Sequence, residues 1–506
     1  MGGGLSRRRF GMLAGGVGVG ALVGCSRRAG EPEVVGPEPA VLVSQVRLPE
    51  PFGVPLPVPA VLAPGRDGRY EVVQRRASVE ILPGVPTEVD AYGGTFPGPT
   101  IVSRSGRPTV VRQVNRLGVP TVTHLHGGNT PSGSDGYPVD LLLPEGGTAQ
   151  HQHDAMGGAV ATGSREYTYP MRQRAATLWY HDHRMDFTGA QVWRGLAGFH
   201  LVHDDEEDAL PLPRGERDVP LMIADRSFKA DGALWYPATD PTGTSPGVAG
   251  DYMGGVLGDV ICVNGVAWPS FEVVAARYRF RILNASNARR YDLALEPAAA
   301  ITQVGSDGGL LASPIRHANL EIAPGERFDV VIDFAAYRPG TRVTLVNRAG
   351  TGRTGQVMRF QVTRKVRDDS TVPNTLADVP PLPRATGTYD RLWSFARAGD
   401  GWLINGQRFD PRRMDADPAL GRTEVWRVVT DLRHPVHIHL SPFRVLSRSG
   451  GAPGAYDAGW KDTVDLRPGE YADLAVRFEQ HRGRYLVHCH NLEHEDMGMM
   501  AAFQVR

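Results

Sequence analysis

One strand-like segment occurs three times along this chain of 506 residues, and this repetition constrains the fold more than any other feature. The copies are TVVRQVN at residues 109–115, YRFRILN at 278–284 and EVWRVVT at 424–430. Pro324-Gly325-Glu326 and Pro468-Gly469-Glu470 each precede a segment of alternating hydrophobicity, and residues 177–183 resemble residues 484–490. We therefore predict three β-domains of similar topology.

The composition agrees with a fold built from short strands and turns. The chain holds 61 glycines and 40 prolines, about a fifth of its residues, and it lacks a long amphipathic helical pattern. Asn264-Gly265 and Asn405-Gly406 each predict a tight hairpin turn. Because a chain of this length exceeds one ordinary hydrophobic core, we expect several all-β domains, each a sandwich or a barrel.

Two segments predict the boundaries between the domains. The acidic run from Asp204 to Asp208, followed by Pro211 and Pro213, favours a solvated linker. The proline-rich residues 373–387 predict a second linker. The predicted domains span residues 66–208, 209–372 and 388–506.

The N-terminal residues 1–25 predict an export signal. Ser6-Arg7-Arg8-Arg9-Phe10, followed by an apolar stretch, resembles a twin-arginine signal. Leu22-Val23-Gly24-Cys25 resembles a lipobox, in which Cys25 is lipidated and becomes the mature N-terminus, and an ordinary cleaved signal is the alternative. Residues 26–65, rich in Pro, Arg and Gly, favour a tether. We therefore expect an extracytoplasmic protein that a lipid on Cys25 anchors to the cell envelope.

Charge and cysteine content limit the expected partners. The formal net charge is zero, which gives no indication of nucleic acid or an anionic membrane surface as a partner. We expect no nucleic-acid partner, membrane contact only through Cys25, and a monomer. The three cysteines, Cys25, Cys262 and Cys489, imply no disulfide framework, and Cys262 in an apolar run predicts a buried thiol.

His488-Cys489-His490, followed by His494 and Met499, predicts a metal site. Successive side chains of an extended strand point to opposite faces, so Cys489 faces away from His488 and His490. A cysteine thiolate with two imidazoles and a weak axial thioether is the ligand set of a blue copper electron-transfer site. Cys489, His494 and Met499 provide three of those ligands, and the second histidine must come from elsewhere in the chain.

Ten of the sixteen histidines lie in four short motifs. The motifs are His124-Leu125-His126, His181-Asp182-His183, His434-Pro435-Val436-His437-Ile438-His439, and His488-Cys489-His490 with His494. A His-x-His pair on a strand puts both imidazoles on one face, which suits a metal, although a single pair is more often a solvated surface pair. Four such motifs together predict a centre with several metal ions. We expect it in the first and third domains, because the middle domain holds only His317.

Three further motifs accompany the histidines. They are His126-Gly127-Gly128 continuing to Asp135-Gly136-Tyr137-Pro138, then Gly459-Trp460-Lys461-Asp462-Thr463, and Glu493-His494-Glu495-Asp496. With the histidine motifs they resemble the multicopper oxidase family, in particular its spore-coat laccase and bilirubin oxidase branch, over nearly all of the chain after residue 65. The resemblance implies an all-β fold of three cupredoxin-like Greek-key domains, each a sandwich or barrel, with a trinuclear copper cluster between the first and third.

The resemblance also implies four copper ions and the ligands of each. The type 1 copper takes His434, Cys489 and His494, with Met499 as the axial ligand. The type 2 copper takes His124 and His437. One type 3 copper takes His126, His181 and His490, and the other takes His183, His439 and His488.

Two acids match positions that relay protons in the resembling branch. Asp135 and Glu495 would supply protons to dioxygen during its reduction to water. The alternatives are a turn residue in Ser134-Asp135-Gly136 and a charged rim residue at Glu495. Electrons would pass from Cys489 to His488 and His490 over a distance on the order of 10 Å.

The resemblance predicts a laccase-like oxidase. It would oxidise phenols, aromatic amines or similar one-electron donors, with dioxygen as the acceptor. Two alternatives stay open: an oxidase of cuprous or manganous ions that confers metal tolerance, and a non-enzymatic copper-binding protein of the cell envelope. His151-Gln152-His153, in a Gly-rich stretch, favours either an accessory copper site or a mobile polar loop.

Overall fold

The computed structural model describes residues 36–147, 156–242, 245–381, 386–399 and 401–506. The expected signal with Cys25, and the pair His151 and His153, lie outside the described residues. Residues 36–65, which belong to the expected tether, include strand β1 (Ala40–Leu42), and β1 pairs in parallel with β13 (Val256–Gly258). This part of the expected tether therefore packs against the middle of the chain.

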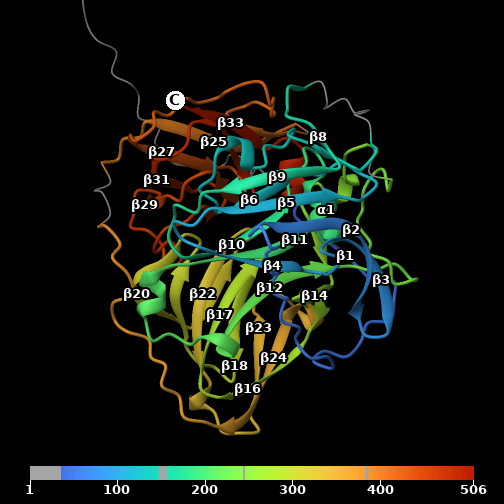
Figure 1. Ribbon diagram of the computed structural model, residues 1–506, viewed down its shortest axis with the longest axis vertical. Coiled ribbons are helices and arrows are strands. Elements are labelled where there is room, and N and C mark those ends of the chain that lie inside the picture. Colours follow the sequence, from blue (N-terminus) through green and yellow to red (C-terminus); the bar gives the residue numbers. More distant parts are fainter. Residues whose placement is uncertain (1–35, 148–155, 243–244, 382–385, 400) are drawn as a thin grey trace, which may run out of the picture. The chain divides into compact units, whose positions relative to one another are not determined.

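Six main sheets follow one another along the chain in three pairs (Figure 1). The first pair consists of a sheet ordered β3 (Val85–Tyr92), β2 (Tyr70–Leu82), β5 (Thr109–Asn115), β9 (Ser164–Tyr169), and a sheet ordered β4 (Gly98–Arg104), β11 (Ala197–His203), β10 (Ala176–Asp182), β6 (Thr123–His126).

The second pair comprises the strands of the middle of the chain. Its larger sheet is ordered β15 (Val266–Ala267), β14 (Val260–Val263), β12 (Asp218–Arg226), β17 (Arg277–Asn284), β22 (Arg327–Asp333), β19 (Ile301–Ser306), β20 (Gly309–His317). Its smaller sheet is ordered β16 (Ser270–Ala275), β24 (Gln356–Lys365), β23 (Arg342–Asn347), β18 (Tyr291–Glu296), β21 (Asn319–Ile322).

The third pair comprises the C-terminal strands. One sheet is ordered β26 (Gly401–Ile404), β25 (Arg391–Ala398), β27 (Thr423–Thr430), β31 (Tyr471–Arg477), β29 (Arg444–Arg448). The other is ordered β30 (Thr463–Leu466), β28 (His434–Ile438), β32 (Gly483–Cys489), β33 (Met500–Val505).

Helices are short and lie in the connections. The α-helices are α1 (Thr188–Arg194), α2 (Asp205–Ala209) and α3 (Leu492–Asp496). The 3-10 helices are η1 (Ser132–Ser134), η3 (Gly215–Arg217), η4 (Gly250–Tyr252), η5 (Phe334–Ala336) and η6 (Gly352–Gly355), and a small parallel sheet joins β7 (Leu142–Leu143) to β8 (Ala161–Thr162). The prediction of an all-β chain is confirmed.

The three copies of the repeated segment occupy equivalent places, as predicted. They form β5, β17 and β27, and each pairs in parallel with one neighbour and antiparallel with the other. The third residue of each copy points into a core: Val111, Phe280 and Trp426 are at most 1% exposed. One repeated pattern of apolar residues therefore builds three separate cores.

The two expected hairpin turns are also present. Asn264-Gly265 joins β14 to β15, and both residues have positive φ, 49° and 86°. Asn405-Gly406 follows β26 with φ of 51° and 74°. Asparagine and glycine tolerate this left-handed backbone better than other residues, which is why the dipeptide predicts the turn.

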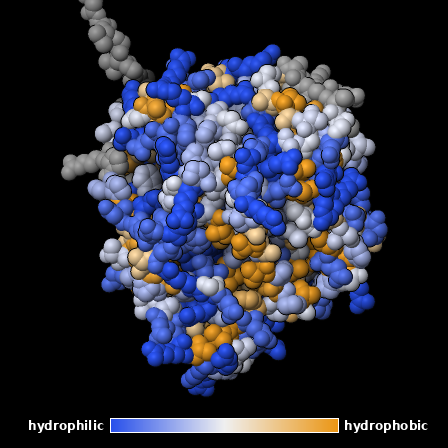
Figure 2. All heavy atoms as spheres, in the orientation of Figure 1, coloured by the Kyte–Doolittle hydropathy of each residue, from blue (hydrophilic) through white to orange (hydrophobic). Residues whose placement is uncertain are grey.

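The surface is mostly polar. The face drawn in Figure 2 is largely hydrophilic, with hydrophobic side chains gathered below its centre. Of the large hydrophobic residues that the structure describes, Val43 and Val61 are the most exposed. Within the described ranges, no helix has the length and apolar character needed to cross a membrane.

One residue of the acidic run after the first sheet pair, Glu207, is buried against the second pair. Glu207 of α2 is 5% exposed, and it accepts hydrogen bonds from Arg279 at 3.1 Å and Arg281 at 2.9 Å, both on β17. Asp204 caps α2 by accepting from the backbone N–H of Glu207. Glu207 is buried because two buried guanidinium groups require a counter-charge, whereas Asp205, Glu206 and Asp208 are exposed.

Glu207→Gln should lower the free energy of unfolding by about 3 kcal/mol, since it leaves buried positive charge without its partner. Burial alone would raise the pKa of Glu207, but Arg281 and Arg279 outweigh burial and hold that pKa well below the ordinary 4.5. A carboxylate with a depressed pKa stabilises the fold above its unfolded pKa and loses this effect as the pH falls. The difference between wild type and variant in denaturant unfolding should therefore shrink below pH 4.5.

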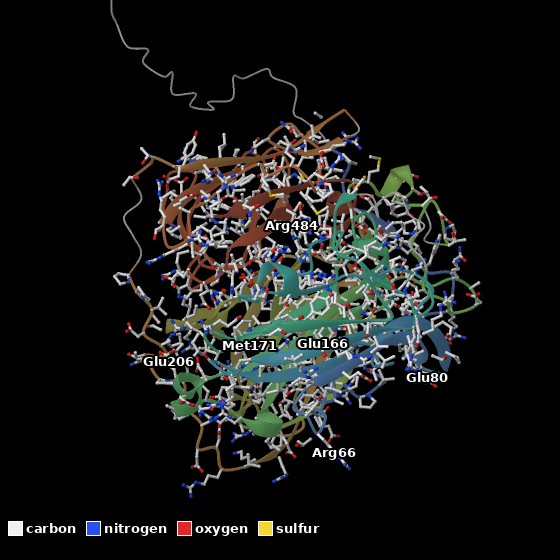
Figure 3. The ribbon with its side chains drawn as sticks, turned by 45° about the horizontal axis from the view of Figure 1, so that its top comes forward. Arg66, Glu80, Glu166, Met171, Glu206 and Arg484 are labelled. Atoms are coloured by element: carbon white, nitrogen blue, oxygen red, sulfur yellow. The ribbon has the colours of Figure 1, made fainter. Side chains whose placement is uncertain are left out.

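Glu206→Gln is the matched control, one residue away. Glu206 lies at the edge of the molecule in Figure 3, and its partly exposed carboxylate accepts from Arg174 at 2.8 Å. Exposed pairs of this kind contribute at most about 1 kcal/mol. An equal loss of stability in both variants would contradict the importance assigned to Glu207.

Candidate metal centre

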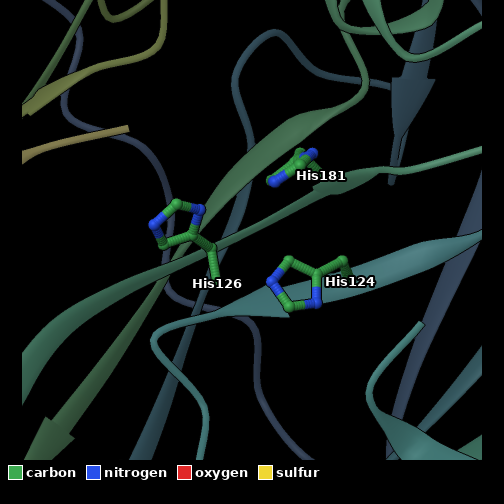
Figure 4. A group of neighbouring side chains, drawn as sticks. All are labelled: His124, His126 and His181. Atoms are coloured by element: carbon green, nitrogen blue, oxygen red, sulfur yellow. The ribbon is translucent and has the colours of Figure 1, made fainter. Parts of the chain in front are cut away.

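The four histidine motifs lie at the ends of paired strands in the first and third sheet pairs. Between β6 and β10 the register sets His124 opposite His181, and between β28 and β32 it sets His437 opposite His488. Figure 4 shows the rings of His124, His126 and His181 close to one another, and these residues belong to β6 and β10. Strand pairing thus places histidines that are far apart in the sequence next to one another.

Four histidines from the first pair meet four from the third pair. The ring of His124 stacks on that of His439 with centroids 3.9 Å apart, and His126 stacks on His437 at 3.7 Å. The eight members, each at most 1% exposed, are His124, His126, His181, His183, His437, His439, His488 and His490. The structure therefore brings together the eight histidines that the sequence motifs singled out in the first and third domains.

Hydrogen bonds orient most of these rings so that one nitrogen is held and the other is free. The Nδ1–H groups of five rings donate to oxygen: His124 to Asp135 O, His181 to Asp182 O, His437 to Asp462 O, His439 to the Asp135 carboxylate, and His488 to Cys489 O. The buried Nε2 atoms of His124, His181 and His437 have no hydrogen-bond partner among the described residues. A donated Nδ1–H leaves Nε2 as the lone-pair donor, which is the arrangement of a metal ligand.

His126 presents the opposite nitrogen. Its Nε2 lies 3.0 Å from the carboxylate of Asp462 and 3.2 Å from the hydroxyl of Thr463, and its buried Nδ1 has no partner in the described chain. Arg327 donates two hydrogen bonds to the same Asp462 carboxylate and keeps it in place. His126 would therefore bind a metal through Nδ1.

Among the described residues, three sets of three histidines in the cluster bring their ligand nitrogens close together: His124, His126 and His181; His124, His437 and His439; and the expected type 3 set His183, His439 and His488. The first two sets combine histidines that were expected at different copper ions. His183, His439 and His488 offer nitrogens within 4.8 Å of one another, and the Nε2 atoms of His439 and His488 are 3.2 Å apart. The rings of the second expected triplet, His126, His181 and His490, have centroids 4.9 to 5.9 Å apart. The rings of the expected type 2 pair, His124 and His437, are 5.8 Å apart.

The chemistry of these donors fits copper. Burial lowers the pKa of His124, His181 and His490, so their imidazoles are neutral and keep a lone pair. Burial also lowers the pKa of His183, to about 4. Buried polar atoms without partners are rare in folded proteins, and neutral imidazole is a preferred ligand of copper. The cluster therefore has the donor set of a metal centre.

The expected type 1 ligands form a second group. The Sγ of Cys489 lies 3.4 Å from Nδ1 of His434 and 3.6 Å from Nδ1 of His494, and the two nitrogens are 3.2 Å apart. Met499 is fully buried, and its backbone carbonyl accepts from the N–H of Cys489 at 3.1 Å. Burial raises the pKa of the Cys489 thiol, so a thiolate here requires a bound cation. These donors also fit copper.

Neighbouring side chains hold the two imidazoles of this second group. Trp402 stacks on His494 with centroids 3.6 Å apart, and the Nε2 of His494 donates to the carbonyl of Gly254 at 3.2 Å. The Nε2 of His434 donates to Asp431 at 3.3 Å. In both rings the Nδ1 atom is left facing the Cys489 sulfur.

The two acids predicted to relay protons both contact the histidine cluster. The carboxylate of Asp135 lies 2.7 Å from Nδ1 of His439, and that of Glu495 lies 3.2 Å from Nδ1 of His488. Neither side chain is exposed, and burial raises the pKa of both. Asp135 therefore does more than form a turn, and Glu495 does not lie on a charged rim.

Residues of the second sheet pair also lie against the histidine cluster. The sequence did not predict this contact. Gly325 has φ of 83°, and a Cβ there would come within 2.9 Å of His490 and 3.1 Å of His126. Arg327, two residues later, reaches Asp462. The repeated Pro-Gly-Glu motif identified the turn that contains Gly325. No sequence feature predicted the role of Arg327, because its partner Asp462 is 135 residues away.

The fold and these donors together define a class of protein. It is a copper protein of the cupredoxin type, with a cysteine-containing site beside a large histidine cluster.

Comparison with known proteins identifies the family. Residues 74–207 and residues 376–506 each match a family model described as multicopper oxidase. A laccase of Bacillus stratosphericus is 37% identical, and the alignment covers 90% of this chain and 99% of the relative. A bilirubin oxidase of Albifimbria verrucaria is 35% identical over 89% of this chain and 81% of its own.

A solved structure agrees with these sequence matches. The multi-copper oxidase from Pediococcus acidilactici superposes with a TM-score of 0.80 at 31% identity, covering 92% of this chain and 93% of that protein. The chain belongs to the multicopper oxidase family. It is therefore a copper-dependent oxidoreductase that uses dioxygen as acceptor and consumes a reducing substrate, and the alternative of a non-enzymatic copper-binding protein is excluded.

Proposed function

We propose that the protein is a laccase-like oxidase that takes electrons one at a time from phenols and aromatic amines through His494. A cavity of about 390 Å³, called the donor pocket below, is lined by His494, Trp402, Leu257 and Leu432. Cys489 and His434 are fully buried and do not line it. Small-molecule sites typically have volumes of about 300 to 1,000 Å³, so one substituted aromatic ring fits.

The proposed path of the electrons runs from His494 to the histidine cluster. We propose four copper ions, one held by the Cys489 group and three by the eight histidines. When bound, they would supply the one-electron redox chemistry. Cys489 ends β32 and is joined by peptide bonds to His488 on that strand and to His490 directly after it. The Nδ1–H of His488 donates to the carbonyl of Cys489 at 3.1 Å. This short connection supports Cys489 as the electron carrier between the two groups.

The proposed proton donors are Asp135 and Glu495. Each is buried against a histidine of the cluster, where bulk water does not reach. Reduction of one dioxygen to two water molecules consumes four electrons and four protons. Four phenols, each losing one electron and one proton, provide both in balance.

The cellular location is also a proposal. The twin-arginine segment and Cys25 support export and a lipid anchor at the cell envelope. We further propose a monomer, since the cluster and the donor pocket are both built from a single chain.

Oxygen-consumption kinetics of the copper-loaded protein test the proposed function. We expect phenols and aromatic amines to support turnover at rates well above those with cuprous or manganous ions, with four donors oxidised per dioxygen. A panel that includes bilirubin-like tetrapyrroles measures the preference. Turnover of cuprous or manganous ions far exceeding that of every organic donor would instead establish the alternative, a metal-ion oxidase.

A further inference from the structure

We propose that the donor pocket selects aromatic donors that carry an anionic group, through the guanidinium groups of Arg433 and Arg290. This inference rests on the proposed function, in which the donor binds beside His494. Both arginines line the pocket, together with a wall formed by the N-terminal residues 36–39, called the N-terminal strap below.

The apolar part of the pocket suits an aromatic ring. Leu257, Leu432 and Pro468 line it, and Trp402 contributes an aromatic face while stacking on His494. The strap narrows the opening: a Cβ on Gly254 would lie 2.2 Å from the carbonyl oxygen of Pro37, so the two backbones are in direct contact. A flat donor fits between such walls better than a bulky one.

The charged part of the pocket has an excess of positive charge in its inner wall. Arg290 and Arg433 lie 2.9 and 2.8 Å from the oxygens of a single carboxylate, that of Asp465. Glu321 is 3.7 Å from Arg433, but it is equally close to Arg467, at 3.6 Å. The pocket itself is lined by three guanidinium groups, those of Arg289, Arg290 and Arg433, and by one carboxylate, that of Glu38, because Asp465 and Glu321 do not line it.

Arg289 and Glu38, the other charged residues that line the pocket, do not cancel the positive charge of Arg290 and Arg433 at its inner wall. Arg289 is neutralised by Asp225 at 2.7 Å. Glu38 belongs to the strap and is exposed to solvent, so water and salt screen its charge. Arg290 is only 15% exposed and Arg433 is 39% exposed, so the inner wall is screened less and Arg433 can still be reached by a ligand.

Guanidinium groups recognise carboxylates and sulfonates through paired N–H donors. Arg433 directly precedes the copper-site residue His434, and the same pocket extends to His494. A donor with its anionic group on Arg433 can therefore direct its ring toward His494. By the same charge, the pocket disfavours cationic donors such as manganous ions.

The test compares two donors with the same ring, syringate with a carboxylate and syringol without one. The quantity measured is the ratio of kcat/KM for syringate to kcat/KM for syringol, in copper-loaded full-length enzyme. Intrinsic differences between the donors cancel when this ratio is compared between variants. Arg433→Gln should lower the ratio roughly fivefold, and Arg433→Lys should restore part of it.

Two further variants complete the design. Glu38→Gln should raise the ratio about twofold, because it removes the opposing charge on the strap. Arg367→Gln is the matched control, since Arg367 is an exposed arginine paired with Asp369 and does not line the pocket. It should leave the ratio unchanged. Added salt should lower the wild-type ratio, since screening weakens the attraction.

An unchanged ratio in Arg433→Gln overturns the inference. If that variant does not fold, a wild-type ratio that is independent of salt and unaltered in Glu38→Gln overturns it instead. Failure of the proposed function has a different signature: wild-type enzyme would then oxidise neither syringate nor syringol with consumption of dioxygen.

Discussion

Replacing Cys489 by serine should abolish the intense visible absorption of the copper-loaded protein and lower donor oxidation by about a thousandfold or more. The Sγ of Cys489 faces the Nδ1 atoms of His434 and His494 at 3.4 and 3.6 Å. A serine hydroxyl does not provide the soft thiolate on which a blue copper site depends. Visible spectroscopy and steady-state oxygen consumption measure the two effects.

Cys262→Ser is the matched control for this variant. Cys262 is as buried as Cys489, but it lies in the core of the second sheet pair, with its Sγ 3.8 Å from the carbonyl of Val260. We expect unchanged absorption and activity, with a loss of stability of about 1 to 2 kcal/mol. A blue colour that persists in Cys489→Ser, or disappears in Cys262→Ser, would contradict the proposed ligand.

Asp135→Ala should retain all four coppers and slow reoxidation of the reduced enzyme by dioxygen about a hundredfold. The variant removes a buried carboxylate that accepts from Nδ1 of His439, while the backbone carbonyl that accepts from His124 remains. Stopped-flow mixing of the reduced enzyme with dioxygen measures this step. Reduction of the oxidised enzyme by the donor without oxygen should proceed at the normal rate.

Asp135→Asn separates proton transfer from positioning. Asparagine keeps an oxygen that can accept from His439 but has no proton to release at that oxygen. If Asp135 relays protons, the Asn variant should be slowed about as much as the Ala variant. Normal turnover across the whole pH range in Asp135→Asn would show that the carboxylate only orients His439.

The repeated segments made most of the fold predictable. The copies at β5, β17 and β27 have the same neighbours in their sheets because the pattern of apolar residues that forms a core is a local property of a strand. The Asn-Gly turns were predictable for the same reason, since they depend on the backbone freedom of two residues.

The membership of the histidine cluster was predictable as well, but its internal geometry was not. His-x-His spacing on a strand puts both rings on one face whatever lies opposite. Which nitrogen each ring presents depends on distant partners. His126 offers Nδ1 because Asp462, 336 positions away, accepts from its Nε2, and no local pattern reveals that contact.

The sequence alone determined the kind of chemistry this protein performs, because the type, number and spacing of its histidines, Cys489 and Met499 are local features. The tertiary structure alone decided which of the two imidazoles beside Cys489 lines a cavity. His494 lines a cavity and His434 does not, since the cavity is enclosed by the N-terminal strap, Gly254 and Trp402, segments that only folding brings together. Exposure depends on long-range packing, whereas ligand chemistry depends on the residues themselves.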